Sequence, residues 1–220
     1  MYNLKKNNYH QKPKASDIQT PLKVSQFIFE LLRNKVSKEE RILDPCAGMG
    51  NLLTPWKKVG YNVIGIDLDK NSPVFWSGND FLKEGSERLF PALKDEIEYR
   101  TLEQIQKDTR KYYNIGLILC NPPFNGYGGK LGSEVWLDKI IEIFGKETPI
   151  VLFVPAGFCL NLTLGSKRYL KFANGEYPPI SSRITLPKNI FLEVLFHSEI
   201  LIFNILNLEP HYFLSPDEKN

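Results

Sequence analysis

The chain has 220 residues, 42% of them hydrophobic and 24% charged, and a formal net charge of +3, as expected for one globular domain with a sizeable core. It contains no apolar run of the roughly 20 residues that a membrane-spanning helix needs and no secretory signal at its polar start, so we expect a cytoplasmic or nucleoid-associated protein without a membrane partner. The three cysteines and three histidines are scattered, which predicts reduced thiols and no metal site.

The start of the chain is predicted to be a basic flexible tail over residues 1–16. Four of its residues are lysines: Lys5, Lys6, Lys12 and Lys14. Two interpretations stay open, a solvated tail or a basic arm that contacts phosphates. Beyond the tail, Thr20 as N-cap and Pro21 at the first helical position predict the start of a helix. The apolar stripe of this helix follows at helical spacing: Val24, Phe27, Ile28 and Leu31.

The next part of the chain predicts strands that flank a turn and a helix. Its elements are a strand at 41–44, a glycine-containing turn at 45–50, a helix that runs to about residue 59, a second strand at 61–66 and a candidate third strand at 74–76. Pro55 predicts an irregular first turn for the helix. The second strand ends at Asp67.

The second half of the chain continues this alternation of strands and helices. Its elements are helical spacing within 84–113, a strand at 115–120, a glycine-rich loop at 125–132, a helix at 134–144, a strand at 149–154, and two late strands at 183–186 and 199–205 that pair with each other. Residues 115–120 are almost wholly apolar, which predicts a strand buried on both faces. The pattern therefore favours an α/β fold with a mostly parallel sheet.

A glycine-containing turn and a carboxylate together predict a nucleoside site. The turn, Asp44-Pro-Cys-Ala-Gly-Met-Gly50, brings its backbone close to a ligand and leads to a helix start with free N–H groups. Roughly twenty residues further on, Asp67 stands at the tip of the second strand, from which a carboxylate binds ribose hydroxyls. Dinucleotide binding would fit this pair too, but the turn lacks the full GxGxxG pattern. A solvent-facing aspartate is the alternative interpretation of Asp67.

A second motif, Asn121-Pro-Pro-Phe124, directly follows the apolar strand. Its two prolines fix the backbone and remove two N–H donors, while their carbonyls remain as acceptors. These acceptors and the uncharged Asn121 side chain suit an NH₂ group, and the Phe124 ring offers a face for stacking. The motif therefore predicts a site for a planar group that carries an amino group.

These motifs resemble those of the amino-directed adenine-N6 DNA methyltransferases, in the subgroup whose cofactor turn precedes the catalytic tetrapeptide. The resemblance rests on Gln19-Thr-Pro21, Asp44 to Gly50, Ile66-Asp-Leu-Asp69, Gly78-Asn-Asp-Phe81 and Asn121 to Phe124, and it covers residues 17–205. It implies a doubly wound, mostly parallel seven-stranded sheet of the class I methyltransferase type, with 206–220 as a C-terminal tail. The strands that end at Asp44 and Cys120 are then neighbours, at the point where strand order reverses.

The resemblance also assigns roles residue by residue. For the cofactor S-adenosylmethionine it implies Thr20 and Pro21 beside the methionine end, Asp44, Cys46 and Gly48 in the methionine-binding turn, Asp67 at the ribose, Asp80 and Phe81 at the adenine, and Asn121 next to them. The residues implied as catalytic are Asn121, Pro122 and Phe124, and those implied to bind the target base are Pro123, Phe124 and Phe191. A place in the hydrophobic core is the alternative for Phe191.

The implied reaction is methyl transfer from S-adenosylmethionine to the N6 amino group of adenine in DNA, by in-line attack from a base that is flipped out of the duplex. The catalytic tetrapeptide is shared with RNA base methyltransferases and protein glutamine methyltransferases, and both remain alternatives. The Thr20-Pro21 element ahead of the cofactor turn favours DNA. A non-catalytic nucleic-acid-binding subunit is a further alternative, and a nicotinamide-dependent dehydrogenase fits less well because GxGxxG is missing.

Sequence recognition on DNA is expected to come from a specificity subunit or a second copy of the chain, or to be loose. A base-reading module usually buries roughly 600–1,000 Å² as a folded unit of its own, and the stretches outside the predicted elements are short. The largest of them, 158–182, carries Lys167, Arg168 and Lys171, which suit phosphates. The contrary possibility is that this stretch and the charged segment 84–113 form a compact reader.

Overall fold

The computed structural model describes residues 18–74, 76–83, 102–124, 130–160, 162–191 and 197–214, without the side chains at 102–105 and 108. The predicted tail at 1–16, the helical spacing at 84–101 and most of the glycine-rich loop lie outside these residues. The helices of the described parts are α1 (Leu22–Leu32), α2 (Thr54–Lys58), α4 (Leu102–Tyr113), α5 (Gly132–Phe144) and α6 (Lys167–Ala173). None of these helices is long and apolar enough to cross a bilayer.

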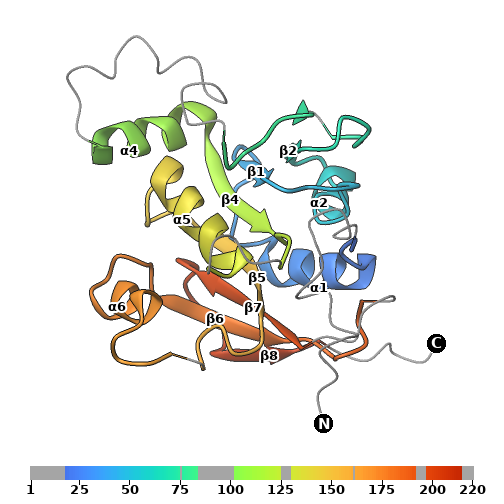
Figure 1. Cartoon of the computed structure of the whole chain (residues 1–220). Coiled ribbons are helices and arrows are strands. Elements are labelled where there is room, and N and C mark those ends of the chain that lie inside the picture. The colour runs from blue at the N-terminus through green and yellow to red at the C-terminus, as the bar shows by residue number, and fades with distance from the viewer. Residues whose placement is uncertain are drawn as a thin grey trace.

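One sheet of eight strands forms the centre of the molecule, in the order β3-β2-β1-β4-β5-β7-β6-β8 (Figure 1). The strands are β1 (Arg41–Asp44), β2 (Asn62–Asp67), β3 (Trp76–Ser77), β4 (Ile115–Cys120), β5 (Ile150–Pro155), β6 (Ile180–Thr185), β7 (Ser198–Phe203) and β8 (His211–Phe213). Neighbouring strands from β3 to β5 are parallel, whereas β7 is antiparallel to both β5 and β6. This confirms the predicted α/β fold and the pairing of the two late strands.

The strand order reverses between β1 and β4. β2 and β3 follow β1 on one side, and the chain then returns through α4 to β4 on the other side of β1. Leu43 of β1 is in register with Ile118 of β4, so the strand ends at Asp44 and Cys120 are neighbours, as predicted. Doubly wound sheets bind their ligands outside the carboxyl ends of the strands at such a point.

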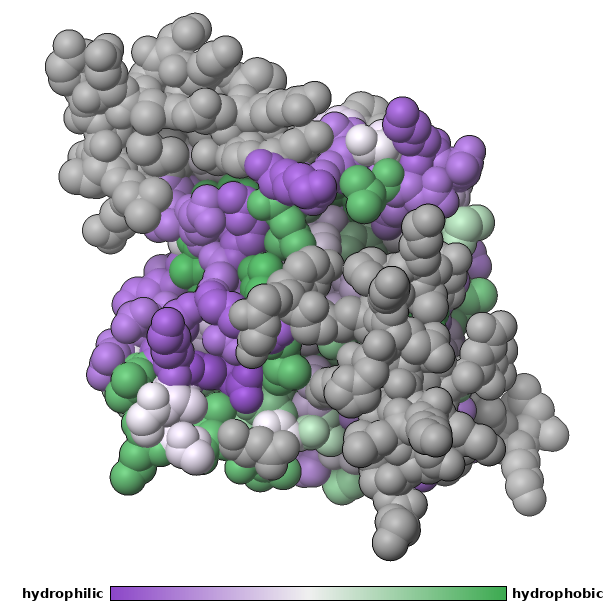
Figure 2. Space-filling model, in the orientation of Figure 1, coloured by the Kyte–Doolittle hydropathy of each residue, from purple (hydrophilic) through white to green (hydrophobic). Residues whose placement is uncertain are grey.

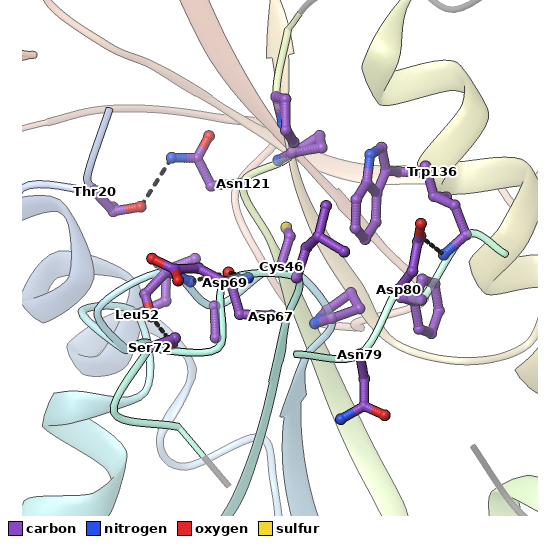
Figure 3. A pocket seen from close by; sticks show the side chains of 18 of the residues that line it. Thr20, Cys46, Leu52, Asp67, Asp69, Ser72, Asn79, Asp80, Asn121 and Trp136 are labelled. Carbon is purple, nitrogen blue, oxygen red and sulfur yellow. Dashed lines mark hydrogen bonds between the residues drawn. The ribbon is translucent and has the colours of Figure 1, made fainter. Parts of the chain in front are cut away.

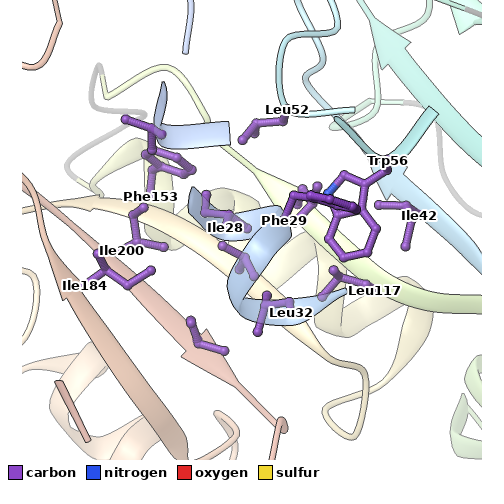
Figure 4. Packing of buried hydrophobic residues seen from close by; sticks show 14 of the residues in the cluster. Ile28, Phe29, Leu32, Ile42, Leu52, Trp56, Leu117, Phe153, Ile184 and Ile200 are labelled. Carbon is purple, nitrogen blue, oxygen red and sulfur yellow. The ribbon is translucent and has the colours of Figure 1, made fainter. Parts of the chain in front are cut away.

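The central strands alternate their side chains between two helical layers. In β4, Leu117 belongs to the apolar cluster of α1 and α2, and Ile118 belongs to the cluster of α5 on the opposite face. All six residues of β4 are buried, which confirms the predicted burial on both faces. Figure 4 shows the first cluster, in which the rings of Phe29 and Trp56 meet edge to face with their centroids 5.2 Å apart.

Several elements differ from their predicted bounds, and α1 begins at Leu22 with Pro21, not Thr20, as its N-cap. α2 begins only at Thr54, because Pro55 fits the first turn of a helix, where a missing N–H breaks no hydrogen bond. The third strand lies at 76–77 rather than at 74–76. The sheet also has an eighth strand, β8, in the stretch that was assigned to a C-terminal tail, so it extends beyond the predicted boundary at 205. This strand has only three residues, two of them exposed, which gives too weak an apolar pattern to be seen in the sequence.

Two ion pairs attach α6 to α5. Arg168 Nη1 lies 3.0 Å from Glu134 Oε2, with the two side chains 13% and 7% exposed, and the guanidinium lies over the Phe158 ring. Lys171 Nζ lies 2.5 Å from Asp138 Oδ1. Two of the three cations that were predicted to suit phosphates are therefore paired within the fold. Hydrophilic residues predominate over α5 and α6 on the face that Figure 2 shows.

We predict that Gly65→Ala destabilises the sheet. A Cβ atom at Gly65 in β2 would lie 2.8 Å from Val74 Cβ and 3.1 Å from Ala47 Cβ. Because Ala47 is buried in the turn after β1 and Val74 packs against the same apolar cluster, relief of the overlap should lower the free energy of unfolding by about 1–3 kcal/mol in urea denaturation. Gly165→Ala is the matched control, since nothing lies within 4 Å of its Cβ position. Equal stability of both variants would contradict this packing.

Candidate active site

A cavity of about 910 Å³ opens at the carboxyl edge of the sheet, where the strand order reverses. Its wall comes from segments that are far apart in the sequence: residues 18–20, 45–49, 67–69, 79–83 and 121–124, with Leu52, Ser72, Val135 and Trp136. Figure 3 shows Thr20 and Asn121 on one side, Asp80 and Trp136 on the other, and Cys46 between them. A cavity of this size holds a ligand as large as a nucleoside with a side chain.

The turn after β1 is held by the carboxylate at the end of β2. Gly48 and Gly50 have φ values of 51° and 77°, in the left-handed region that favours glycine. Asp67 Oδ2 accepts the Gly48 N–H at 2.7 Å, and Asp67 Oδ1 accepts the Asp69 N–H at 2.8 Å. A carboxylate offers about four acceptor positions, so Asp67 can still accept hydrogen bonds from a ligand in the cavity. The predicted position of Asp67, beside the turn, is thus what the structure shows.

Asp44 is buried behind the turn after β1, where it stabilises the turn, and it does not line the cavity. Its side chain is 1% exposed, and its Oδ1 accepts the Cys46 N–H at 3.1 Å. Burial raises the pKa of the Asp44 carboxyl to about 7, and the charge of Asp67 adds to the rise. The structure thus shows Asp44 in contact with the turn, and its direct contact with the cofactor stays a prediction. Pro21 is also outside the lining, where its carbonyl accepts the N–H groups of Val24 and Ser25 at the start of α1.

The tetrapeptide after β4 contributes all four of its residues to the cavity wall. Asn121 Nδ2 donates a hydrogen bond to Thr20 Oγ1 at 2.9 Å. Asn121 Oδ1 is buried and has no hydrogen-bond partner among the described residues. Asn121 thus lines the cavity and carries an uncharged acceptor oxygen to which no described residue donates.

The 79–83 segment and α5 form the opposite wall. Phe81 is buried and its ring stacks on Trp136, with centroids 5.5 Å apart and planes 5° apart. Asp80 accepts the Leu82 N–H and pairs with Lys83. Asp80 and Phe81 both line the cavity, and their contact with the adenine of the cofactor stays a prediction. Trp136 was not identified from the sequence, since an aromatic on the buried side of a helix is indistinguishable in sequence from a core residue.

Two further residues change the predicted picture. Gln19, which received no role from the sequence, lines the cavity, and its Oε1 accepts the Met49 N–H at 3.0 Å. Phe191, the candidate for packing on the base, is 1% exposed and belongs to the apolar cluster of α1 and α2. In this structure Phe191 therefore occupies the core position that was its alternative, and not the wall of the cavity.

Two thiols, one of them in the wall of the cavity, lie next to each other. Cys46 Sγ and Cys120 Sγ are 3.6 Å apart, and all three cysteines are free. Burial raises the pKa of both Cys46 and Cys120, so these thiols stay protonated at neutral pH. Among the residues that the structure describes, no group of three histidine, cysteine or acidic side chains is placed to hold a metal ion.

We predict that Asp44 makes the protein less stable as the pH rises. Its ordinary pKa is 3.8 and its pKa in the folded chain is about 7, so between these values the folded state keeps a proton that the unfolded chain has released. The stabilisation, a few kcal/mol at about 1.4 kcal/mol per pKa unit, is present below pH 4 and lost as the pH rises through 7.

Asp44→Asn retains an oxygen for the Cys46 N–H but cannot ionise. We therefore expect it to flatten the fall of the unfolding free energy between pH 4 and pH 7, measured by urea denaturation at several pH values. An identical pH slope in the parent chain and the variant would contradict this assignment.

Comparison with known proteins identifies the fold. No protein-family model matches the sequence, and no curated protein matches it. Among solved structures, the modification subunit of a putative type I restriction enzyme from Vibrio vulnificus matches 94% of this chain with 14% identity and a TM-score of 0.59. A putative class I S-adenosylmethionine-dependent methyltransferase from Listeria monocytogenes matches 93% with 14% identity and a TM-score of 0.59.

A type I restriction-modification methyltransferase subunit from Streptococcus thermophilus matches 93% of the chain with 16% identity and a TM-score of 0.52. The chain spans about half the length of the two restriction-enzyme subunits, 49% and 46%, and 68% of the Listeria protein. Each of these similarities covers at least 93% of this chain, at 14–16% identity. The chain therefore has the fold of the class I S-adenosylmethionine-dependent methyltransferases.

Proposed function

We propose that this chain transfers a methyl group from S-adenosylmethionine to the N6 amino group of adenine in DNA. The observation that carries the proposal is Asn121 Oδ1, a buried acceptor without a hydrogen-bond partner among the described residues. It shares one cavity with Asp67 and the glycine turn. A donor site for the methyl group and an acceptor site for an amino group would then lie next to each other, as a direct transfer requires.

The residues of the cavity fit the cofactor. The Asp67 carboxylate suits the two ribose hydroxyls, and the turn at 46–49, which lines the cavity, suits the methionine part. The stacked pair of Phe81 and Trp136, beside Asp80, suits the adenine ring. When bound, S-adenosylmethionine supplies an activated methyl group on a positively charged sulfur.

The tetrapeptide would act on the amino group of the target. The lone pair of an exocyclic amino nitrogen is delocalised into the ring, which makes it a poor nucleophile. Asn121 Oδ1 and the Pro122 carbonyl would each accept one amino hydrogen, and this favours a pyramidal nitrogen aimed at the methyl carbon. The nitrogen–carbon bond forms as the sulfur–carbon bond breaks, and the nitrogen then releases one proton to solvent. Positioning contributes most of the rate in such a mechanism, and no strong base is needed.

An aromatic side chain at the cavity suits an unstacked base. The amino group of adenine is inaccessible inside a duplex, so the base has to leave the stack. Phe124 lines the cavity directly after the two prolines and would stack on the base. DNA is favoured as substrate because several structures of the same fold are modification subunits of restriction enzymes, and a specificity subunit or a second copy would supply sequence recognition.

A methyl-transfer assay tests this function. The chain is incubated with S-adenosylmethionine that carries an isotope-labelled methyl group and, separately, with a mixed-sequence DNA library, structured RNA and a glutamine-containing peptide. We expect N6-methyladenine in the digested DNA by mass spectrometry. Label found only in RNA or only in peptide glutamine would assign the site to those substrates instead and contradict the DNA proposal.

Asp67→Ala should weaken binding of S-adenosylmethionine at least tenfold in calorimetry. Each charge-assisted hydrogen bond to a hydroxyl contributes roughly 1.5–3 kcal/mol, and the variant removes both acceptor oxygens. Asp67→Asn keeps one acceptor and should lie between the variant and the parent chain. Glu30→Ala, at an exposed carboxylate of α1, is the matched control and should bind normally. Unchanged affinity in Asp67→Ala would remove this residue from the site.

Asn121→Ala should lower the rate of methyl transfer by at least 100-fold, as does the loss of one positioned hydrogen-bonding group in other enzymes. Affinity for S-adenosylmethionine should stay within about threefold, because the lost acceptor faces the target amino group. Asn189→Ala, at an exposed asparagine outside the cavity, serves as control. Near-full activity of Asn121→Ala would refute an amino-directed mechanism.

A further inference from the structure

We propose that Thr20 is a positioning residue that sets the orientation of the Asn121 amide. Thr20 precedes Asn121 by 101 residues, yet its Oγ1 accepts the hydrogen bond from Asn121 Nδ2 at 2.9 Å (Figure 3). The inference rests on the proposed function, because it explains how the acceptor in that site is aimed.

Thr20 is itself held by the turn after β1. Its carbonyl accepts a hydrogen bond from Asn51 Nδ2 at 2.8 Å, and the neighbouring Gln19 accepts the Met49 N–H at 3.0 Å. Thr20 is 6% exposed, so its side chain has little room to move. The Thr20 hydroxyl therefore has a fixed position, and it links the turn at 45–50 to the tetrapeptide after β4.

An asparagine needs such a fixed point because the two ends of its amide have nearly the same shape. Rotation by 180° about the last side-chain bond exchanges the acceptor oxygen for the donor NH₂ group. With Nδ2 held at Thr20, Oδ1 is turned away from it, and this is the buried oxygen that has no partner among the described residues. In the reverse orientation the Thr20 hydroxyl would donate to Oδ1, and the amide donors would face the amino group of the substrate, which is also a donor.

This role differs from the contact with the methionine end of the cofactor that the family resemblance implies for Thr20. A cofactor contact acts on the affinity for S-adenosylmethionine. A positioning role acts on the rate of transfer at saturating cofactor, and on the Asn121 amide even before any substrate is bound.

Thr20→Val preserves the shape of the side chain and removes its hydroxyl, whereas Thr20→Ser retains the hydroxyl. In single-turnover assays at saturating S-adenosylmethionine and DNA, we expect Thr20→Val to transfer at least tenfold more slowly, since small misplacements of a reacting group cost up to about 100-fold. Thr20→Ser should keep at least half of the parent rate, and calorimetry should show cofactor affinity within threefold in both variants.

The side-chain amide resonance of Asn121, assigned by its loss in Asn121→Asp, gives a second readout. It should shift in Thr20→Val and stay in place in Thr20→Ser. Thr185→Val is the matched control, because this threonine contacts His211 outside the cavity and its loss should change neither rate nor resonance.

Three results would overturn the inference: a Thr20→Val variant as fast as the parent chain, a Thr20→Ser variant as slow as Thr20→Val, or a slow rate that saturating cofactor restores. A parent chain that methylates no substrate at all would instead contradict the proposed function. The two failures are therefore distinguishable in one set of assays.

Discussion

The parallel pairing of β1 with both of its neighbours is the constraint on which the site depends. β1 has four residues, and its register sets Asp44 opposite Gly65 of β2 and Leu43 opposite Ile118 of β4. The carboxyl ends of three strands therefore lie at the same edge of the sheet. The glycine turn, the carboxylate at the end of β2 and the tetrapeptide after β4 meet around one cavity for this reason. Gly65 permits the approach, because a side chain there would overlap the turn.

Most of the polar groups at this edge of the sheet are hydrogen-bonded within the protein, whereas one acceptor is not. Both oxygens of Asp67 receive backbone N–H groups, and Asp44 is buried under the turn with a raised pKa. Thr20 and Asn51 tie the start of the chain's described part to the same turn. Asn121 Oδ1 alone among these acceptors has no partner in the described residues. A buried acceptor without a partner is costly, and a bound amino group would satisfy it.

The features predicted from sequence are those with local signals. Six consecutive apolar residues indicate the doubly buried strand β4, and a strand tip at Asp67 indicates a carboxylate at the sheet edge. The neighbouring places of the turn and the tetrapeptide follow from the topology of doubly wound sheets. The hydrogen bond between Thr20 and Asn121 does not, because it depends on how α1 is placed against the sheet by packing of residues such as Phe29 and Trp56.

Errors arose where sequence shows the residue type but not its environment. Phe191 and Trp136 are both buried aromatics, and only the three-dimensional packing assigns the first to the core and the second to the cavity wall. Asp44 and Asp67 both end a strand, yet one points under the turn and the other lines the cavity. β8 is three residues long and pairs with β6, not with the preceding strand β7, so no local sequence pattern indicates it.

The most direct test of this account is a crystal structure of the chain with S-adenosylmethionine. The account predicts the cofactor in the cavity at the switch point, with its ribose hydroxyls hydrogen-bonded to Asp67 and its methyl group on the side of Asn121 Oδ1. Asn121 Nδ2 should remain at Thr20. A cofactor bound elsewhere, or one whose methyl group faces away from Asn121, would contradict the claim that one cavity unites the methyl donor with the amino-group acceptor.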